Sequence, residues 1–139
     1  MKLSKEELLL KANSVCKANL METLQIEFVD AGENFITARM PVNNRVHQPD
    51  GVLHGGATAA LAETVGSFAA HIFIDTKAHF VRGIDLSAQH VKSVKTGYVY
   101  AKAKCMHNGR TTQVFDIKVT NDNNELISLC KLTTIIIPK

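Results

Sequence analysis

One segment, residues 54–70, limits the possible fold more than any other part of the sequence. Its alanines favour a helix, and large apolar side chains recur at helical spacing along and just beyond it, at Leu61, Val65, Phe68 and Ile72. The remaining positions are rich in alanine and glycine, whereas a surface helix would carry charged residues there. A helix that is apolar nearly all the way round is buried on most sides. The fold must therefore be built around this helix.

Glu63 is the only ionisable residue between positions 54 and 71. At about 100° per residue it lies roughly 200° around the helix from Leu61, so we expect it to face away from the surface on which the apolar stripe packs. A buried carboxylate needs a partner, yet no Lys or Arg occurs between Arg45 and Lys77. This favours a functional carboxylate over a structural ion pair.

Most of the chain outside this helix alternates apolar and polar residues with the period of two that is typical of strands. Ser4, followed by Glu6 and Glu7, predicts a short N-terminal helix with acidic groups near the positive end of its dipole. Residues 43–51 have no period and predict a loop. The expected strands cover residues 23–29, 35–42, 81–94, 98–106, 111–120 and 125–137. We expect the last four of them to form an antiparallel meander.

These elements predict a single α+β domain over residues 1–139. Only an antiparallel sheet can bury the helix stripe, and a sheet curled around one long helix is the hot-dog fold. One sheet would leave the small-residue face of the helix open, so a second subunit should cover it and make at least a dimer, arranged as a dimer of dimers. That face carries Ala59, Ala62, Gly66, Ala69 and Ala70.

Composition excludes several classes of function. The formal net charge is only +3 and the basic residues are scattered, so no nucleic-acid partner is expected, although a weak positive field suits an anionic ligand. The cysteines, Cys16, Cys105 and Cys130, are too few and too far apart for a disulfide framework or a zinc site. No signal peptide and no run long enough to cross a bilayer is present. We expect a cytoplasmic protein with no metal, no cofactor and no membrane partner.

The loop and the start of the helix bring together Gln48, His54, Gly55, Glu63 and Ser67. Hydrolysis of a thioester needs a base or nucleophile and a donor at the developing oxyanion. The backbone N–H of Gly55 suits the second role, because amides at a helix N-terminus are unpaired and the dipole favours negative charge. Glu63 lies about two turns, roughly 12 Å, further along. Within one chain that is too far for both groups to reach one carbonyl carbon, so the site would combine Glu63 of one subunit with Gly55 of its partner.

The sequence QPDGVLHGGA at residues 48–57, followed by ALAETVGS at residues 60–67, resembles the bacterial hot-dog acyl-CoA thioesterases. These include the phenylacetate-pathway, 4-hydroxybenzoyl-CoA, dihydroxynaphthoyl-CoA and enterobactin proofreading enzymes. The resemblance covers nearly the whole chain. It implies that Glu63 is the nucleophile or general base, and that the Gly55 amide polarises the carbonyl. It further implies that Gln48 and His54 orient the thioester and that amide, and that Ser67 positions water or the acyl group.

The resemblance also implies a set of residues that bind the substrate, an aromatic or medium acyl-CoA. Gly83, His90 and Lys92 match channel-lining positions of the long strand, and residues 106–111 match a hairpin that holds the CoA nucleotide. The residues of that hairpin are Met106, His107, Asn108, Gly109, Arg110 and Thr111. A guanidinium such as that of Arg110 pairs well with phosphate. The stretch AQHVKS at residues 88–93 departs from relatives, which often carry a second His and an Arg-Pro pair.

Two other functions compete with hydrolysis of an acyl-CoA. A hot-dog hydratase or dehydratase acting on acyl carrier protein would resemble a His-Phe-Pro-Gly pattern before the helix, but residues 46–51 read VHQPDG. A non-catalytic acyl-CoA-binding module would gain nothing from a desolvated carboxylate beside a thioester, so Glu63 argues against it. The sequence leaves open whether CoA or acyl carrier protein carries the acyl group, and whether Glu63 attacks or activates water.

Overall fold

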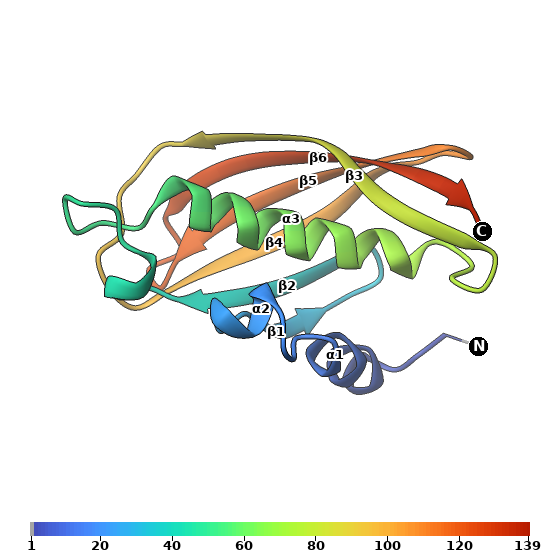
Figure 1. Cartoon of the computed structure of the whole chain (residues 1–139), viewed down its shortest axis with the longest axis horizontal. Helices are drawn as coiled ribbons and strands as arrows, with labels where there is room; N and C mark the ends of the chain where they lie inside the picture. The colour runs from blue at the N-terminus through green and yellow to red at the C-terminus, as the bar shows by residue number, and fades with distance from the viewer. Residues whose placement is uncertain (1) are drawn as a thin grey trace.

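The computed structural model describes residues 2–139 and contains a six-stranded antiparallel sheet around one long helix (Figure 1). The helices are α1 (Lys5–Ser14), α2 (Leu20–Thr23) and α3 (Gly55–Ile72), with a 3-10 turn at Asn44–Val46. The strands are β1 (Glu27–Ala31), β2 (Phe35–Pro41), β3 (His79–His90), β4 (Tyr98–Asn108), β5 (Thr112–Asn121) and β6 (Leu126–Pro138). The predicted α+β architecture and its central helix are therefore present.

The N-terminal region differs from the prediction after its first helix. Ser4 caps α1 as expected, and its hydroxyl accepts from the Glu7 N–H while the Glu7 carboxylate accepts from the Ser4 N–H. The strand predicted from residue 23 is wrong, because Thr23 ends α2 and β1 begins only at Glu27. Gln25 adopts a left-handed φ of 56° between them, which reverses the chain. Alternation of side chains could not reveal this turn.

The position of β3 corrects the predicted meander. The strand order is β1-β2-β4-β5-β6-β3, so β3 pairs with β6 at the far edge of the sheet and not with β4. It ends at His90 instead of residue 94, and the N–H groups of Val91 and Lys92 turn to the Ile127 carbonyl. A strand's period defines its two faces but says nothing of which neighbour it pairs with, so this order was open in the sequence.

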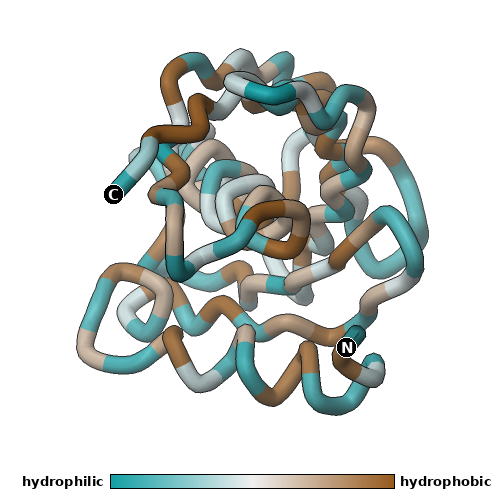
Figure 2. Tube along the Cα trace, turned by 90° about the vertical axis from the view of Figure 1, so that its right-hand side faces the viewer, coloured by the Kyte–Doolittle hydropathy of each residue, from teal (hydrophilic) through white to brown (hydrophobic). Residues whose placement is uncertain are grey.

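The small-residue face of α3 packs on the chain's own sheet, and the argument that a second subunit must cover it is wrong. Ala62, Gly66, Ala69 and Ala70 are buried together with Leu61 and Val65. Ile72, at the end of the stripe, is 41% exposed. The sheet curls around the helix, which lies near the centre of the view in Figure 2. Among residues 2–139, no helix is long and apolar enough to cross a membrane.

Close contact between α3 and the sheet depends on Gly66. A Cβ atom there would lie 2.6 Å from Leu132 Cδ2 and 2.8 Å from Ile117 Cδ1. Both neighbours are fully buried strand residues. The glycine therefore allows the helix to pack closely against the concave face of the sheet. This close packing fixes the position of the opposite face of α3, which carries Glu63.

Candidate active site

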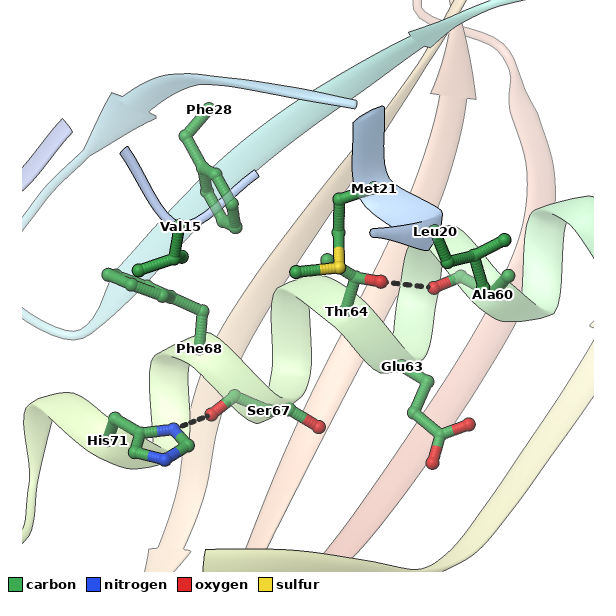
Figure 3. A pocket seen from close by; sticks show the side chains of 10 residues that line it. All are labelled: Val15, Leu20, Met21, Phe28, Ala60, Glu63, Thr64, Ser67, Phe68 and His71. Atoms are coloured by element: carbon green, nitrogen blue, oxygen red, sulfur yellow. Dashed lines mark hydrogen bonds between the residues drawn. The ribbon is translucent and has the colours of Figure 1, made fainter. Parts of the chain in front are cut away.

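The face of α3 that lies at the open side of the curled sheet, between its edge strands β1 and β3, carries Glu63, Ser67 and His71, one turn apart (Figure 3). Glu63 faces away from the buried stripe as predicted, but it is exposed and not the buried, desolvated carboxylate that the sequence led us to expect, and Ser67 is half-buried. The Ser67 carbonyl accepts from His71 Nδ1 at 2.7 Å. These side chains border a cavity of about 410 Å³ between α3 and the N-terminal segment. A pocket of this size lies at the lower end of the range for small-molecule sites.

The walls of this cavity are almost entirely apolar. They are formed by Val15, Leu20, Met21, Phe28, Ala60, Thr64 and Phe68, in addition to the three polar residues. None of these seven was predicted as a site residue, although Ala60 and Thr64 fall within the motif of residues 60–67. The structure reveals the N-terminal part of the wall, where large apolar residues such as Leu20, which is 56% exposed, are left uncovered.

Glu63 lies against Gly83 of the edge strand β3. A Cβ atom on Gly83 would come within 3.0 Å of Glu63 Oε1 and 3.3 Å of Leu132 Cδ1. The β3 register also shifts between Gly83 and Asp85. The structure thus brings together two residues that were predicted for the site from distant parts of the chain, and the glycine leaves room for the carboxylate.

The N-terminus of α3 leaves one amide free. His54 is the N-cap residue, and its Nδ1 accepts from the Gly56 N–H at 2.8 Å. No acceptor for the Gly55 N–H is present in residues 2–139. His54 therefore caps the second helical amide, while the first one remains available to a carbonyl oxygen.

His90, at the end of β3, lies directly over Gly55. A Cβ atom on Gly55 would be 2.8 Å from His90 Nε2. The other ring nitrogen, Nδ1, lies 3.0 Å from Ser128 Oγ, which donates to the Gln89 carbonyl at 3.2 Å. Ser128 thus holds the imidazole beside the free amide. Ser128 was not among the predicted site residues, because its role depends on the pairing of β3 with β6.

Two predicted residues do not join this arrangement within the chain. Lys92 lies beyond the end of β3, where its ammonium pairs with Glu125. The backbone of Gln48 bonds to Val52 and Gly51 in the loop, but its side chain makes no hydrogen bond within the described residues. In the sequence, Gln48 lies shortly before the N-terminus of α3, where the Gly55 amide is free. Lys92 was predicted to lie on the long strand, but that strand ends two residues earlier, at His90.

The predicted nucleotide hairpin lies at the opposite end of α3 from Gly55. Fully buried Gln113 donates through Nε2 to Asn108 Oδ1 at 3.1 Å and to the Ala70 carbonyl at 3.3 Å, and it accepts from Thr134 Oγ1 at 3.0 Å. This polar network fixes the base of the hairpin to the last turn of α3. Arg110, Met106 and His107 are exposed around it.

The surroundings of the three cysteines do not activate their thiols. Burial raises the pKa of the thiols of Cys16, Cys105 and Cys130 above the ordinary value. A raised pKa reduces the thiolate fraction at neutral pH, and the thiolate is the reactive form. This agrees with the interpretation of Cys105 as part of an apolar strand face.

Comparison with known proteins identifies the class. Residues 50–128 match the model of the thioesterase superfamily. The chain is 35% identical over 125 residues to 1,4-dihydroxy-2-naphthoyl-CoA hydrolase of Escherichia coli, covering 90% of this chain and 91% of that protein. It is 37% identical over 122 residues to the proofreading thioesterase EntH of Cronobacter turicensis, covering 88% of each.

Solved structures of thioesterases are also similar to this chain. A mutant thioesterase from Pseudomonas aeruginosa superposes with a TM-score of 0.93 at 36% identity, covering 94% of each chain. A thioesterase from Haemophilus influenzae superposes with a TM-score of 0.90 at 37% identity, covering 99% of this chain and 93% of that one. The chain belongs to the thioesterase superfamily and has the hot-dog fold. It is a thioester hydrolase, as the sequence predicted.

Proposed function

We propose that the protein is an acyl-CoA thioesterase that releases free CoA and a carboxylic acid, with Glu63 as its catalytic carboxylate. The observation that carries this proposal is the placement of Glu63. Among residues 2–139 it is the only carboxylate on the wall of this largely apolar cavity, and no ion pair involves it. A carboxylate without a cation partner is free to attack a carbonyl or to take a proton from water.

The reaction divides between two groups. The Gly55 N–H donates to the thioester oxygen and stabilises the charge that develops there. In one route Glu63 attacks the carbonyl carbon, the C–S bond breaks, and water then hydrolyses the resulting anhydride. In the other route Glu63 takes a proton from water, which attacks the same carbon. Both routes release the CoA thiol and the acid.

A single turnover in ¹⁸O-labelled water detects attack by Glu63. Label in the Glu63 carboxylate is expected only if an anhydride forms and water attacks its Glu63 carbonyl carbon. Label in the product acid alone is expected from direct attack of water on the thioester and also from attack of water on the acyl carbon of an anhydride, so mass spectrometry of rapidly quenched enzyme, which detects acylated Glu63, distinguishes these two cases.

Each site draws on two subunits in this proposal, because Gly55 and Glu63 are eight residues apart on one helix, roughly 12 Å. The strand β3 supports this pairing of subunits. Within the described part of the chain it pairs with β6 alone, which leaves its other edge open, and its Ile84 is 56% exposed. Antiparallel pairing of two β3 strands centred between Leu86 and Ser87 would set Gly83 opposite His90 of the partner subunit. The partner's Gly55 would then lie near Glu63.

The helix start offers a clean test of the Gly55 amide. Pro is tolerated at the first position of a helix and removes its N–H, and His54 already has the extended backbone (φ −66°, ψ 129°) that a residue before Pro adopts. Gly55→Pro should reduce kcat about 10²–10³-fold, the size expected for one oxyanion donor. Gly55→Ala is the matched control, because it adds the same Cβ beside His90 and keeps the amide.

Mixed dimers test the shared site. Co-refolding Glu63→Gln with Gly55→Pro chains should restore about a quarter of wild-type activity, since half of the dimers are mixed and each has one intact site. If each site lay within one chain, every mixture would stay as inactive as its parents.

We further propose that the hairpin of residues 106–111 binds the CoA nucleotide. Arg110 is exposed at its tip, and guanidinium groups bind phosphate well. Arg110→Ala should raise KM for an acyl-CoA while leaving KM for the same acyl group on N-acetylcysteamine unchanged. An equal change with both substrates would contradict the assignment. Tight binding of acyl-CoA without release of thiol by the wild type would instead indicate a binding module.

A further inference from the structure

The N-terminal segment that borders the cavity beside Glu63 carries large apolar side chains that the fold leaves partly uncovered. Val15 and Leu20 are 48% and 56% exposed, and both line the cavity with Met21. They come from α2 and the connection before it, which lie over α3 beside β1 (Figures 1 and 3). These residues also precede the part of the chain that matches the family model.

The segment is firmly anchored to the sheet. The side-chain amide of Asn13 forms hydrogen bonds with both backbone polar groups of Phe28. It accepts from the Phe28 N–H at 2.7 Å and donates to the Phe28 carbonyl at 3.0 Å. Ala12 and Cys16 on the same stretch are buried in the core. The apolar side chains over the cavity are thus held in place by the fold, and their exposure is not the result of a loose terminus.

The cavity's chemistry defines what it can accept. Apart from Glu63, Ser67 and His71, the described lining consists of apolar groups and Thr64. The Thr64 hydroxyl already donates a hydrogen bond to the Ala60 carbonyl at 2.7 Å. A charged acyl group would lose its hydration there without a cation to replace it. An uncharged, apolar group would cover the exposed Leu20 and Val15 instead.

The length of the cavity along α3 limits the size of that group. Glu63 and His71 are eight residues apart, roughly 12 Å. An extended chain advances about 3.5 Å for every three bonds, so roughly ten bonds span this distance. Phe28 and Phe68, which both line the cavity, pack against each other with ring centroids 5.0 Å apart.

We propose that Val15, Leu20 and Met21 form the outer wall of an acyl chamber and set the acyl preference of this enzyme, for uncharged apolar acyl groups up to about ten bonds long. This inference rests on the proposed function, because it takes Glu63 as the group beside the thioester. Met21 is the most adaptable of the three, because an unbranched thioether fits irregular gaps.

Chain-length profiles of two opposed variants test the wall. Wild-type kcat/KM should rise from butyryl-CoA to octanoyl-CoA, by about fourfold for each buried methylene at most, and fall for hexadecanoyl-CoA. Met21→Trp should fill the chamber and depress octanoyl-CoA at least tenfold with little effect on butyryl-CoA. Met21→Ala should move the optimum to longer chains. Leu10→Ala is the matched control, since Leu10 is 74% exposed on the same segment but does not line the cavity.

The same series as non-hydrolysable CoA thioethers, measured by calorimetry, separates this inference from the proposed function. If no ester is hydrolysed but thioether affinity follows chain length and Met21→Trp removes that dependence, the chamber stands and the catalytic proposal fails. If wild type hydrolyses the esters and folded Met21→Trp and Met21→Ala keep the wild-type profile in both measurements, the N-terminal wall does not set the preference.

Discussion

The two sides of α3 are built on opposite principles. On the sheet side, Leu61, Val65 and Gly66 are buried, and a single added carbon at Gly66 would collide with strand side chains. On the other side, Glu63 is exposed and Ser67 and Thr64 border an open cavity. One side is packed as densely as a protein core and the other is left unfilled.

This contrast shows how one helix can both stabilise a fold and present a reactive group. Dense packing on the sheet side fixes the helix in position and rotation, since interiors tolerate little change of volume. The cavity side can then hold an uncompensated carboxylate without endangering the fold, because water still reaches it. Changes on the two sides should therefore affect different measurements.

The largest effect is expected from Glu63→Gln, which keeps the shape and removes the charge. We expect kcat to fall about 10²–10⁴-fold, the usual contribution of a general base, with no loss of stability, because Glu63 is exposed and forms no ion pair among the described residues. Thiol release and urea unfolding measure the two quantities. A large loss of stability would show that the carboxylate is structural.

The opposite result is expected at Leu61, two residues before Glu63 and on the sheet side of the helix. Leu61→Ala removes a fully buried side chain and should lower the free energy of unfolding by about 2–5 kcal/mol. The matched change on the cavity side, Ser67→Ala, should stay within about 0.5 kcal/mol while altering turnover. Equal destabilisation by the two variants in urea would contradict the division between the sides.

A smaller effect on stability is expected from His54, the residue that caps the N-terminus of α3. His54→Ala removes the acceptor of the Gly56 N–H and should cost about 1 kcal/mol of stability. His54→Asn is the informative control, because Asn is a good N-cap and should recover that stability. If activity stays low in His54→Asn, the imidazole serves the reaction beyond capping the helix.

The smallest effect concerns the contact between the start of α1 and the sheet. The Lys5 ammonium beside Asp30 lowers the pKa of that carboxyl below its ordinary value. A lowered folded-state pKa adds stability that is present above the unfolded value, near pH 4, and is lost as pH falls through the folded one. Lys5→Met should thus reduce stability slightly at pH 7 and not at pH 2. A difference that persists in acid would point to lost packing of the Lys5 side chain.

Much of the architecture could be predicted because it depends on local pattern. The long central helix, the capping box at Ser4 and the turn at Asn108-Gly109 follow from residue types a few positions apart. The class of enzyme followed from the motif around Glu63. The place of β3 could not be predicted, because pairing with β6 joins residues about 40 to 60 positions apart, and no local period encodes such a choice.

The site divides in the same way. The sequence by itself determined that a lone carboxylate lies on a buried helix and that glycines open the start of that helix. Only the tertiary structure decided that the small-residue face packs on the chain's own sheet, that His90 stands over Gly55, and that Val15, Leu20 and Met21 wall the cavity beside Glu63. The physical reason is the sequence separation of the interacting residues. Helix faces and caps depend on neighbours within one or two turns, whereas a cavity is enclosed by segments that are distant in the sequence.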